Sequence, residues 1–315
     1  MMAAAVTKAV PVAPGFPQFA GVWTPAVWAS DILVHFYETS VLPAISNTKY
    51  EGLISGKGDR VIIRVMPDVV WKPYAKGQSL IYDDMTPGQV ELVVDKAEYW
   101  GAKIDDIDKM QSDIDWLDKF TMSAAETGKI NVDKAVLGAF YADVSSENSG
   151  SAAGAVSGSI NLGETGAPLA MTKLNVTDII VDAETVLDEQ KAPQIGRWMV
   201  LPPILTNLLR KSELKDASLT GDGTSILRNG RVGMVGNFTI YTSTLLPWVM
   251  DGANRTYHIP FGTKDALTFA AQIPPKNVER LRSEQFFGTL VRGLMVYGFE
   301  VLYPDMVGSL YAYKA

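Results

Sequence analysis

Two stretches of alternating apolar and polar residues flank an irregular segment in the first third of the chain. Residues 60–65 and 90–95 both repeat with a period of two, and the residues between them include several prolines and glycines. This period is typical of β-strands, so residues 49–97 are predicted to form a long two-stranded arm with an irregular tip. At about 3.3 Å per residue, legs of roughly 15–20 residues would reach about 50 Å from the base.

The tip of this predicted arm carries many apolar side chains. An isolated two-stranded ribbon is only marginally stable in water, so these side chains need a surface that covers them. The hairpin could fold onto its own domain, or its tip could contact another subunit. The tip residues that are candidates for contact between subunits are Val69, Val70, Trp71, Lys72, Tyr74, Lys76, Leu80, Ile81 and Tyr82.

The first 29 residues are predicted to form a second arm. Prolines recur every few residues from Pro11 to Pro25, which prevents a continuous helix, and large apolar rings lie among them. An apolar arm without secondary structure must lie on its own body or on a neighbour. Its candidate contact residues are Phe16, Phe19, Trp23 and Trp28. A short helix is predicted to follow, from about Ala29 to Val41, and to end at Pro43.

Residues 105–143 carry the strongest helical pattern of the chain. Apolar and small residues recur at steps of three and four, which predicts one long helix. At 1.5 Å per residue it would be about 57 Å long, with Gly128 as a position where it could bend or divide. The opposite face of its first half is acidic, with Asp106, Asp108, Asp113, Asp115 and Asp118. Carboxylates scattered on one helix usually form a solvated face, so no metal site is predicted there.

The second half of the chain predicts a compact lobe and a return to long strands. Residues 146–169 are rich in serine, glycine and alanine and are predicted to be a flexible loop. Residues 170–264 mix helical and strand patterns and predict an α/β lobe, with a helix from Val176, a strand over Arg197–Leu201, a helix from Pro203 to Leu209 and a strand over 231–241. Strands are also predicted over Leu267–Ile273 and over residues 285–303. The last strand is apolar on both faces, so we expect it to be buried on both sides, beneath the long helix.

Composition excludes several kinds of function. The chain has 315 residues, of which 47% are hydrophobic and 20% charged, so a sizeable folded core is expected. Its net charge of −7 disfavours tight nucleic-acid binding by the free subunit, because phosphate binding requires a basic surface. Cysteine is absent and histidine occurs only twice, which excludes thiol chemistry and leaves little material for a zinc site or a catalytic triad.

No motif of an enzyme or a membrane protein is found in the sequence. Phosphate-binding, dinucleotide-binding, zinc-protease and calcium-loop motifs are all missing, and prolines or polar residues interrupt the uncharged stretches. The sequence therefore predicts a protein that is not an enzyme and has no catalytic, cofactor-binding or metal-binding residues. It also predicts no secretory signal and no contact with a membrane.

Four strings of residues, together with the order of the predicted elements, indicate a known family. The strings are SVLP at 40–43 with Asn47-Thr48, GDRVII at 58–63, GMVGNFTIYTS at 233–243 and RGLMVYG at 292–298. In these strings and in the order of its predicted elements, the chain resembles the coat proteins of tailed bacteriophages with the Hong Kong 97 fold. The resemblance implies an α+β fold with an N-terminal arm (1–29), a long β-hairpin E-loop (49–97), a P-domain (30–48, 98–145 and 265–315) that contains the spine helix (105–143), and an α/β A-domain (170–264).

The same resemblance implies a function and a set of partners. The chain would be a major capsid protein that forms hexamers and pentamers of an icosahedral head shell around double-stranded DNA, which it would contact without sequence specificity on the inner face. Because the β-arm begins near residue 49, no room remains for a long N-terminal scaffolding segment, so a separate scaffolding protein is implied, together with a portal and a cement protein. The shell would be assembled in the host cytoplasm and become part of the virion. In the assembly hypothesis, the β-arm lies across the spine helix of a neighbour and the N-terminal arm reaches a further neighbour.

Two other functions are compatible with the sequence. An encapsulin-type nanocompartment shell would keep the fold and enclose an enzyme in place of DNA. A soluble α/β enzyme with an unrecognised site would belong to another class of protein. Sedimentation separates these classes, because a shell protein forms very large particles whereas such an enzyme runs as a small oligomer.

Overall fold

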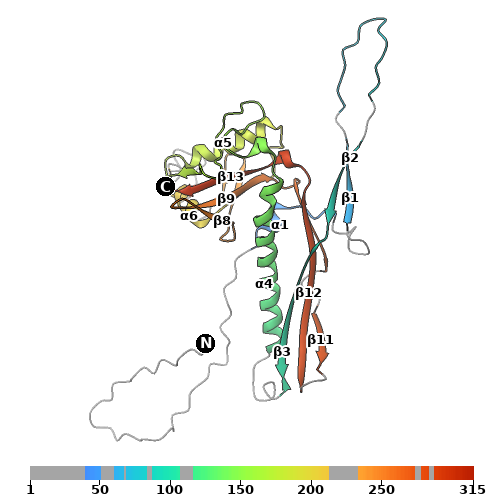
Figure 1. Cartoon of the computed structure of the whole chain (residues 1–315), viewed down its shortest axis with the longest axis vertical. Helices are drawn as coiled ribbons and strands as arrows, with labels where there is room; N and C mark the ends of the chain where they lie inside the picture. The colour runs from blue at the N-terminus through green and yellow to red at the C-terminus, as the bar shows by residue number, and fades with distance from the viewer. Residues whose placement is uncertain are drawn as a thin grey trace, which may run out of the picture. The chain divides into compact units, whose positions relative to one another are not determined.

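The computed structural model describes residues 40–50, 60–66, 69–83, 87–106, 116–212, 233–273, 278–283 and 287–315 (Figure 1). The side chains of residues 116–119 and 273 lie outside this description. The contacts divide the chain into two units, Met1–Val34 and His35–Ala315, and every described residue belongs to the second unit. The predictions for the first 29 residues, and for most of the helix from Ala29 to Val41, therefore concern residues outside the description.

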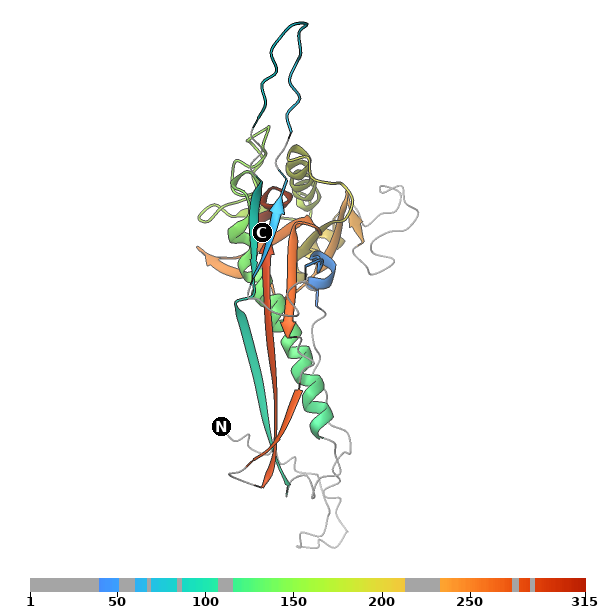
Figure 2. The ribbon, with the colours of Figure 1, turned by 90° about the vertical axis from the view of Figure 1, so that its right-hand side faces the viewer.

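Two antiparallel strands form the predicted arm, β1 (Arg60–Val65) and β2 (Gly88–Val93). Val61 pairs with Leu92 and Ile63 with Val90, so the apolar side chains of the two alternating patterns share one face of the ribbon. Both strand predictions are confirmed. Residues 69–83 continue beyond the strands as an irregular tip, which Figure 1 and Figure 2 show extending from the end of the hairpin.

A four-stranded antiparallel sheet follows the arm. Its longest strand, β12 (Gly288–Val301), pairs with β3 (Lys96–Asp105), with β10 (Leu267–Ile273) and with β11 (Val278–Arg282). The predicted strands over 267–273 and 285–303 are confirmed. Strand β3 was not predicted, because its lysines, glutamate and glycine do not alternate with apolar residues as regularly as those of β1.

Helix α4 (Trp116–Ala139) packs on one face of this sheet and ends in a 3₁₀ turn, η1 (Phe140–Asp143). Val136 and Phe140 belong to a buried cluster with Met295 and Tyr297 of β12, so the predicted packing of a long helix on a long strand is confirmed. Asp105, the first residue of the predicted helix, belongs instead to β3 and pairs with Gly288. Asp106 is helical, and residues 107–115 lie outside the description, so the helix over them stays a prediction. The helix also continues through Gly128 and does not divide there.

The other face of β12 is covered only in part. Near the base of the arm, Val296 packs with Leu92 and Val94. Further along the sheet, Leu294 is 44% exposed and its pairing partner Tyr99 is 85% exposed. The expectation of burial on both sides is therefore wrong for the first half of the strand, because α4 covers one face and the described elements leave Leu294 and Tyr99 open to solvent.

A mixed seven-stranded sheet forms the second lobe. Its strands are, in order, β4 (Leu169–Met171), β13 (Val307–Lys314), β9 (Asn254–Thr263), β5 (Arg197–Leu201), β7 (Phe238–Thr242) and β6 (Met234–Val235), and β8 (Trp248–Asp251) also pairs with β9. Helices α5 (Val176–Glu189) and α6 (Pro203–Arg210) contribute to one buried cluster with this sheet. The predicted helices and the strand over 197–201 are confirmed. The membership of β13 in this sheet was not foreseen, since residues 265–315 were assigned to the P-domain as a whole.

The lobe and the long helix share a second buried cluster. Trp198 and Val200, from the central strand β5, pack with Val136 and Phe140 of the α4–η1 segment. Met199 and Leu201 of the same strand belong to the first cluster, so β5 is covered on both faces. Two 3₁₀ turns complete the described elements near this junction, η2 (Ser146–Asn148) and η4 (Pro304–Met306).

A short helix precedes the arm, α1 (Leu42–Ile45). Pro43 was predicted to end a helix, but it lies in the first turn of α1. A proline is tolerated at that position because the N–H that it lacks would have no partner within the helix. The predicted end of a helix at Pro43 is therefore wrong.

Candidate intersubunit contact surfaces

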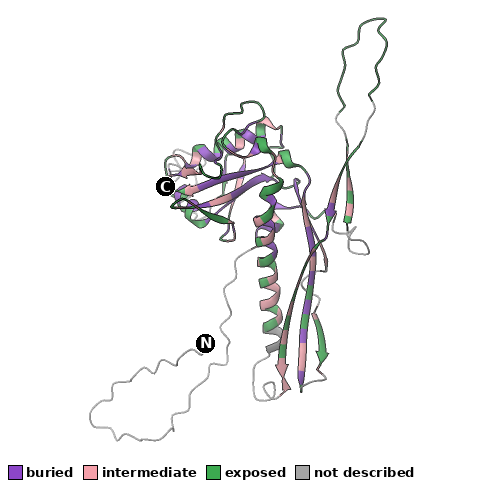
Figure 3. Ribbon diagram, in the orientation of Figure 1, coloured by how far each residue is buried: buried purple, intermediate pink, exposed green. Residues whose placement is uncertain are grey.

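The tip of the β-arm is exposed along its whole described length, residues 69–83 (Figure 3). Trp71 is 94% exposed and Tyr82 is 86% exposed, although both carry large aromatic rings. The other apolar candidates of the tip are exposed to between 63% and 73%: Val69, Val70, Tyr74, Leu80 and Ile81. Soluble proteins seldom leave such a large apolar group in water, so the tip is a candidate binding surface.

The hydrogen bonds found within the described tip join its residues to one another. Lys72 Nζ lies 2.5 Å from Asp83 Oδ1, across the two legs. At the turn, the N–H of Gln78 donates to the carbonyl oxygen of Ala75, and the N–H of Ala75 donates to Gln78 Oε1. These bonds give the tip a defined turn without attaching it to the body. Lys76, the other lysine candidate, is exposed.

The base of the arm, in contrast, packs firmly on the sheet. Leu92, Val94 and Ala270 are buried together, with Ile63 packed against them. Any β-carbon at position 298 would collide with the carbonyl oxygen of Val93, so Gly298 allows β2 to cross β12 at close range. The arm is therefore anchored at its base and open to solvent at its tip.

A second apolar surface lies on the side of the four-stranded sheet that α4 does not cover. Tyr99 and Leu294 are paired across β3 and β12, and Leu281 of β11 pairs with Leu290 of the same face. Leu281 is 40% exposed, and Leu294 and Tyr99 are exposed as given above. An ion pair between Arg292 and Glu279, 2.7 Å apart, crosses this face. We refer to Tyr99, Leu281, Leu290 and Leu294 as the open sheet face.

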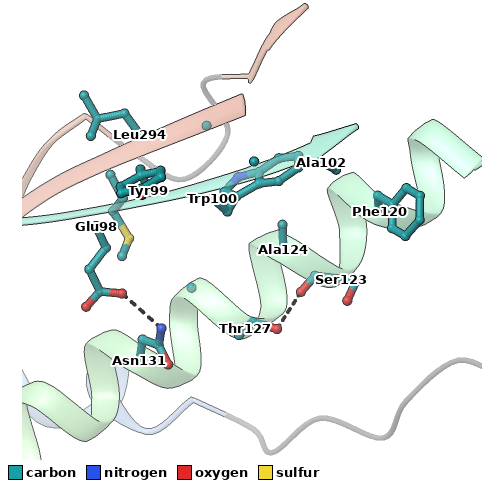
Figure 4. A pocket seen from close by; sticks show the side chains of 14 residues that line it. Glu98, Tyr99, Trp100, Ala102, Phe120, Ser123, Ala124, Thr127, Asn131 and Leu294 are labelled. Carbon is teal, nitrogen blue, oxygen red and sulfur yellow. Dashed lines mark hydrogen bonds between the residues drawn. The ribbon is translucent and has the colours of Figure 1, made fainter. Parts of the chain in front are cut away.

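A cavity of about 310 Å³ lies between the first half of α4 and strands β3 and β12 (Figure 4). Trp100 lies on its sheet side, and the small residues Ser123, Ala124 and Gly128 lie on its helix side. Small residues at these positions leave the space that larger ones would fill, so the first half of the helix packs on the sheet less tightly than its second half.

One carboxylate connects helix and sheet at the end of this cavity. Glu98 Oε2 accepts a hydrogen bond from Asn131 Nδ2 of α4 at 3.0 Å (Figure 4), and Glu98 Oε1 accepts one from Tyr297 Oη of β12 at 3.0 Å. Burial, followed by this hydrogen bond to Glu98, raises the pKa of the Tyr297 hydroxyl far above its ordinary value of 10.0. Tyr297 therefore stays protonated and serves as a donor.

The acidic residues predicted for the spine helix have different positions. Asp106 directly follows β3, and its Oδ2 lies 2.5 Å from Arg282 Nη2 of β11. Asp106 is helical, as predicted, and its place directly after β3 brings its carboxylate beside Arg282. Asp118 lies within α4, but its side chain is outside the description, and Asp108, Asp113 and Asp115 lie outside the described residues, as do Phe16, Phe19, Trp23 and Trp28.

Sequence reasoning missed Asp133, a carboxylate that is only 1% exposed. It lies on α4 beside Val132, in the stripe of residues that faces the core. A charged residue at a position where the helical period predicts an apolar one was the signal that could have identified it. The open sheet face was missed because apolar residues on both faces of β12 were taken to mean burial on both sides.

The acidic residues and the histidine of the described part of the chain do not gather into one site. No group of three or more histidine, aspartate or glutamate side chains there is arranged to hold a metal ion. His258 stacks on Tyr141 with ring centroids 4.3 Å apart and lies 4.6 Å from the ring of Tyr311, which is a packing role. Among the described helices, none is long and apolar enough to cross a membrane.

An anchored β-hairpin with an apolar tip, a long helix packed on an antiparallel sheet, and an α/β lobe together define the class of shell-forming subunits with the Hong Kong 97-like α+β fold. A family model described as "Phage capsid protein" matches residues 91–307. The chain therefore belongs to the phage capsid protein family, and it is a major capsid protein, the structural protein that self-assembles into the phage head shell. No curated protein matches the chain.

Solved capsid structures have the same fold. The chain is similar to a structure from Mycobacterium phage Che8, with a TM-score of 0.73 and 25% sequence identity over 93% of this chain and 98% of that one. It is also similar to the capsid of Cyanophage P-SCSP1u, with a TM-score of 0.70 and 14% identity over 93% of each chain. The capsid of Ralstonia phage GP4 has a TM-score of 0.68 and 14% identity over 97% of this chain and 98% of that one.

Proposed function

We propose that this chain builds an icosahedral head shell of hexamers and pentamers around the double-stranded DNA of a tailed phage, through arms that each copy exchanges with its neighbours. In this proposal residues 49–97 are the E-loop, 1–29 the N-terminal arm, 170–264 the A-domain, and 30–48, 98–145 and 265–315 the P-domain. The protein has a structural role and performs no catalytic step. The exposed tip of the β-arm is the observation that carries the proposal.

The energetic argument starts from the apolar side chains of the tip. Covering one large apolar side chain contributes about 1.5–3 kcal/mol, and the tip exposes several of them. Trp71 and Tyr82 are the most exposed of these. Because the described tip makes its hydrogen bonds within itself, the surface that covers it has to come from elsewhere. In a shell, a neighbouring copy supplies that surface at each position, so the contribution repeats for every subunit.

The open sheet face is the surface that fits the tip best. Tyr99, Leu294 and Leu281 are exposed apolar side chains on one side of the sheet of the same chain. Helix α4 exposes Phe120 and Met122 in its first half, but mainly polar residues such as Lys129 in its second half. We therefore place the tip of one copy on the open sheet face of the next copy. The hypothesis from the sequence placed it across the spine helix of that copy.

Partners other than further copies follow from the same assignment. A separate scaffolding protein, a portal and a cement protein complete the proposed shell, which forms in the host cytoplasm. The net charge of −7 disfavours tight binding of DNA by the free subunit, because tight binding needs many lysine or arginine contacts with phosphates. In the proposed shell the DNA is enclosed, and its sequence is not read.

Replacing residues 69–83 by a short glycine–asparagine turn tests the proposal. The variant should keep the thermal unfolding midpoint of the free subunit, because the tip packs on nothing in the described body. It should fail to form closed shells, as seen by sucrose-gradient sedimentation and negative-stain microscopy. The matched control is Ser79→Ala, which changes an exposed tip residue and leaves the apolar group and the candidate lysines intact. Normal shells from the tip replacement would refute the proposal.

A further inference from the structure

The carboxylate of Asp133 lies in apolar surroundings. Val132 and Val136, its neighbours on the inward stripe of α4, belong to the buried cluster that also contains Val41 and Leu42. Burying a charged group is unfavourable unless hydrogen bonds replace its water. An apolar side chain would suit the position by packing alone, so the function of Asp133 lies in the groups that it binds.

Both carboxylate oxygens bind the segment that leads into α1. Ser40 Oγ donates to Asp133 Oδ1 at 2.7 Å, and the backbone N–H of Val41 donates to Asp133 Oδ2 at 2.7 Å. Val41 is the N-cap residue of α1, and no side chain of its own caps that helix. Asp133 thus holds the start of α1 from a distant part of the chain, through hydrogen bonds of the strong, charge-assisted kind.

The other end of the same segment is attached to β10. The backbone N–H of Asn47 donates to the carbonyl oxygen of Leu267, and the N–H of Phe269 donates to the carbonyl oxygen of Asn47, both at 2.9 Å. Lys49 Nζ lies 2.6 Å from Asp265 Oδ1. Residues 40–49 are therefore fixed at two points, to α4 at Ser40 and to β10 at Asn47. The residues that precede the first point lie outside the description, and the β-arm follows the second point.

We infer that Asp133 is a positioning residue for shell assembly, because it fixes the point from which the N-terminal segment leaves the body toward a neighbouring copy. This inference rests on the proposed function, in which that segment is one of the two exchanged arms. A segment that starts from a fixed point loses less freedom when it binds than one whose base is loose. Loss of Asp133 therefore weakens association between subunits while the body stays folded.

Three full-length variants test this role. Asp133→Ala removes both hydrogen bonds. Asp133→Asn keeps both, because its amide oxygen accepts from the Val41 N–H and its amide N–H donates to the Ser40 hydroxyl. Val136→Ala is the control, since it deletes part of a fully buried side chain three residues further along α4 without removing a bond to Ser40. For each variant, thermal unfolding of the free subunit and the subunit concentration at which particles form are measured, the latter by sedimentation.

Asp133→Ala should raise the particle-forming concentration by about tenfold or more, the effect expected from losing hydrogen bonds to a charged group. Asp133→Asn should change it by less than about threefold. Val136→Ala should assemble normally below its unfolding temperature, even with an equal or larger decrease in that temperature. If Asp133→Ala and Val136→Ala weaken assembly in proportion to their losses of stability, Asp133 is merely structural and the inference is overturned.

Two further results keep the test decisive. If Asp133→Ala does not fold, Ser40→Ala removes one of the two bonds from the other side, and it should raise the particle-forming concentration by about threefold. An unchanged concentration for Ser40→Ala would then refute the inference. The proposed function has its own test in the tip replacement: normal assembly of that variant refutes the exchange of arms, whereas its failure beside normal assembly of Asp133→Ala refutes only the positioning role.

Discussion

The second lobe and the tip of the β-arm contain the same kinds of side chain in opposite surroundings. In the lobe, Phe238 and Phe261 are fully buried, and their rings meet edge to face with centroids 5.9 Å apart. In the tip, Trp71 is 94% exposed. The lobe buries these two rings within one copy of the chain, and the described tip leaves its largest ring in water. A capsid subunit needs both, because a stable body must exist before assembly and a contact surface must remain for it.

The ion pairs of the two regions differ in the same way. Lys72–Asp83 in the tip and Arg197–Asp188 in the lobe have nearly equal N–O distances, 2.5 Å and 2.6 Å. The Lys72 side chain is 43% exposed, whereas that of Arg197 is fully buried. Arg197 also donates to the carbonyl oxygens of Pro193 and Ala192. Distance alone therefore says little about the strength of a pair, and burial decides what its loss costs.

The largest expected effect separates the two regions by stability. Phe238→Ala should lower the free energy of unfolding by about 3–5 kcal/mol, because it opens a cavity in a packed core. Trp71→Ala should change the free energy of unfolding by less than about 0.5 kcal/mol, because the exposed ring loses few contacts when it is removed. Urea unfolding of the free subunit measures both. A large loss of stability for Trp71→Ala would show that the tip packs on its own body.

The two ion pairs give the next expected effect. Arg197→Ala should destabilise the subunit by about 2–4 kcal/mol, because it empties a buried site and leaves the carbonyl oxygens of Pro193, Glu184 and Ala192 without their donor. Lys72→Ala should cost at most about 1 kcal/mol, and 1 M salt should remove even that. Unfolding in low and high salt tests the pair of variants, with Lys72→Gln as a control for the side-chain stem. Equal losses for Arg197→Ala and Lys72→Ala would contradict the comparison.

The sequence predicted most of the elements whose two faces differ. The apolar residues of strands β1 and β2 and of helix α5 repeat with a clear period. The structure contains these elements at or within a few residues of the predicted positions. Strand β3 lacked such a period, since both polar and apolar residues occur on each of its faces. The predicted helix therefore included Asp105, which belongs to β3, and the ion pair between Asp106 and Arg282 was not predicted.

The contact surfaces were only partly predictable. The apolar tip could be predicted from the sequence, because the prolines and glycines around Trp71 disfavour regular secondary structure while apolar side chains lie among them. The open sheet face was not, because a period does not say whether a second layer covers a strand. The role of Asp133 depends on its hydrogen bond with Ser40, which lies 93 positions away in the sequence. No local sequence pattern reveals such a bond. Tertiary pairing of this kind requires the fold.

A smaller effect compares a buried and an exposed tyrosine of one sheet. Tyr297→Phe should lower stability by about 1 kcal/mol, because Glu98 loses one of its donors. Tyr99→Phe is the matched control, since that residue is 85% exposed, and it should leave stability unchanged. Thermal unfolding at pH 7 compares them. If the two variants behave alike, the bond from Tyr297 to Glu98 does not help to hold α4 on the sheet.

The smallest effects concern pH, and His258 gives the first. Burial lowers the pKa of His258 below its ordinary value of 6.5, so the folded subunit prefers the neutral ring between Tyr141 and Tyr311. Its contribution to stability is therefore complete above pH 6.5 and is lost as the pH falls through the lowered pKa. His258→Gln should remove this part of the acid sensitivity. The measurement is the urea midpoint between pH 8 and pH 5, where an unchanged slope would exclude His258 as its source.

Glu300 of β12 should act in the opposite direction. Burial raises its pKa above the ordinary 4.5, and the nearby carboxylates of Asp143 and Asp95 raise it further. The folded state therefore holds the proton more tightly than the unfolded state, so this group adds stability as the pH falls through the raised pKa toward 4.5. Glu300→Gln should raise the urea midpoint at pH 7 and flatten its dependence on pH in that window. Lys72→Gln is the control: it changes a charge in the exposed tip and should leave the dependence of the urea midpoint on pH unaltered. If Glu300→Gln and the unmodified subunit also show the same dependence on pH, the carboxylate of Glu300 is solvated like the side chains of the tip.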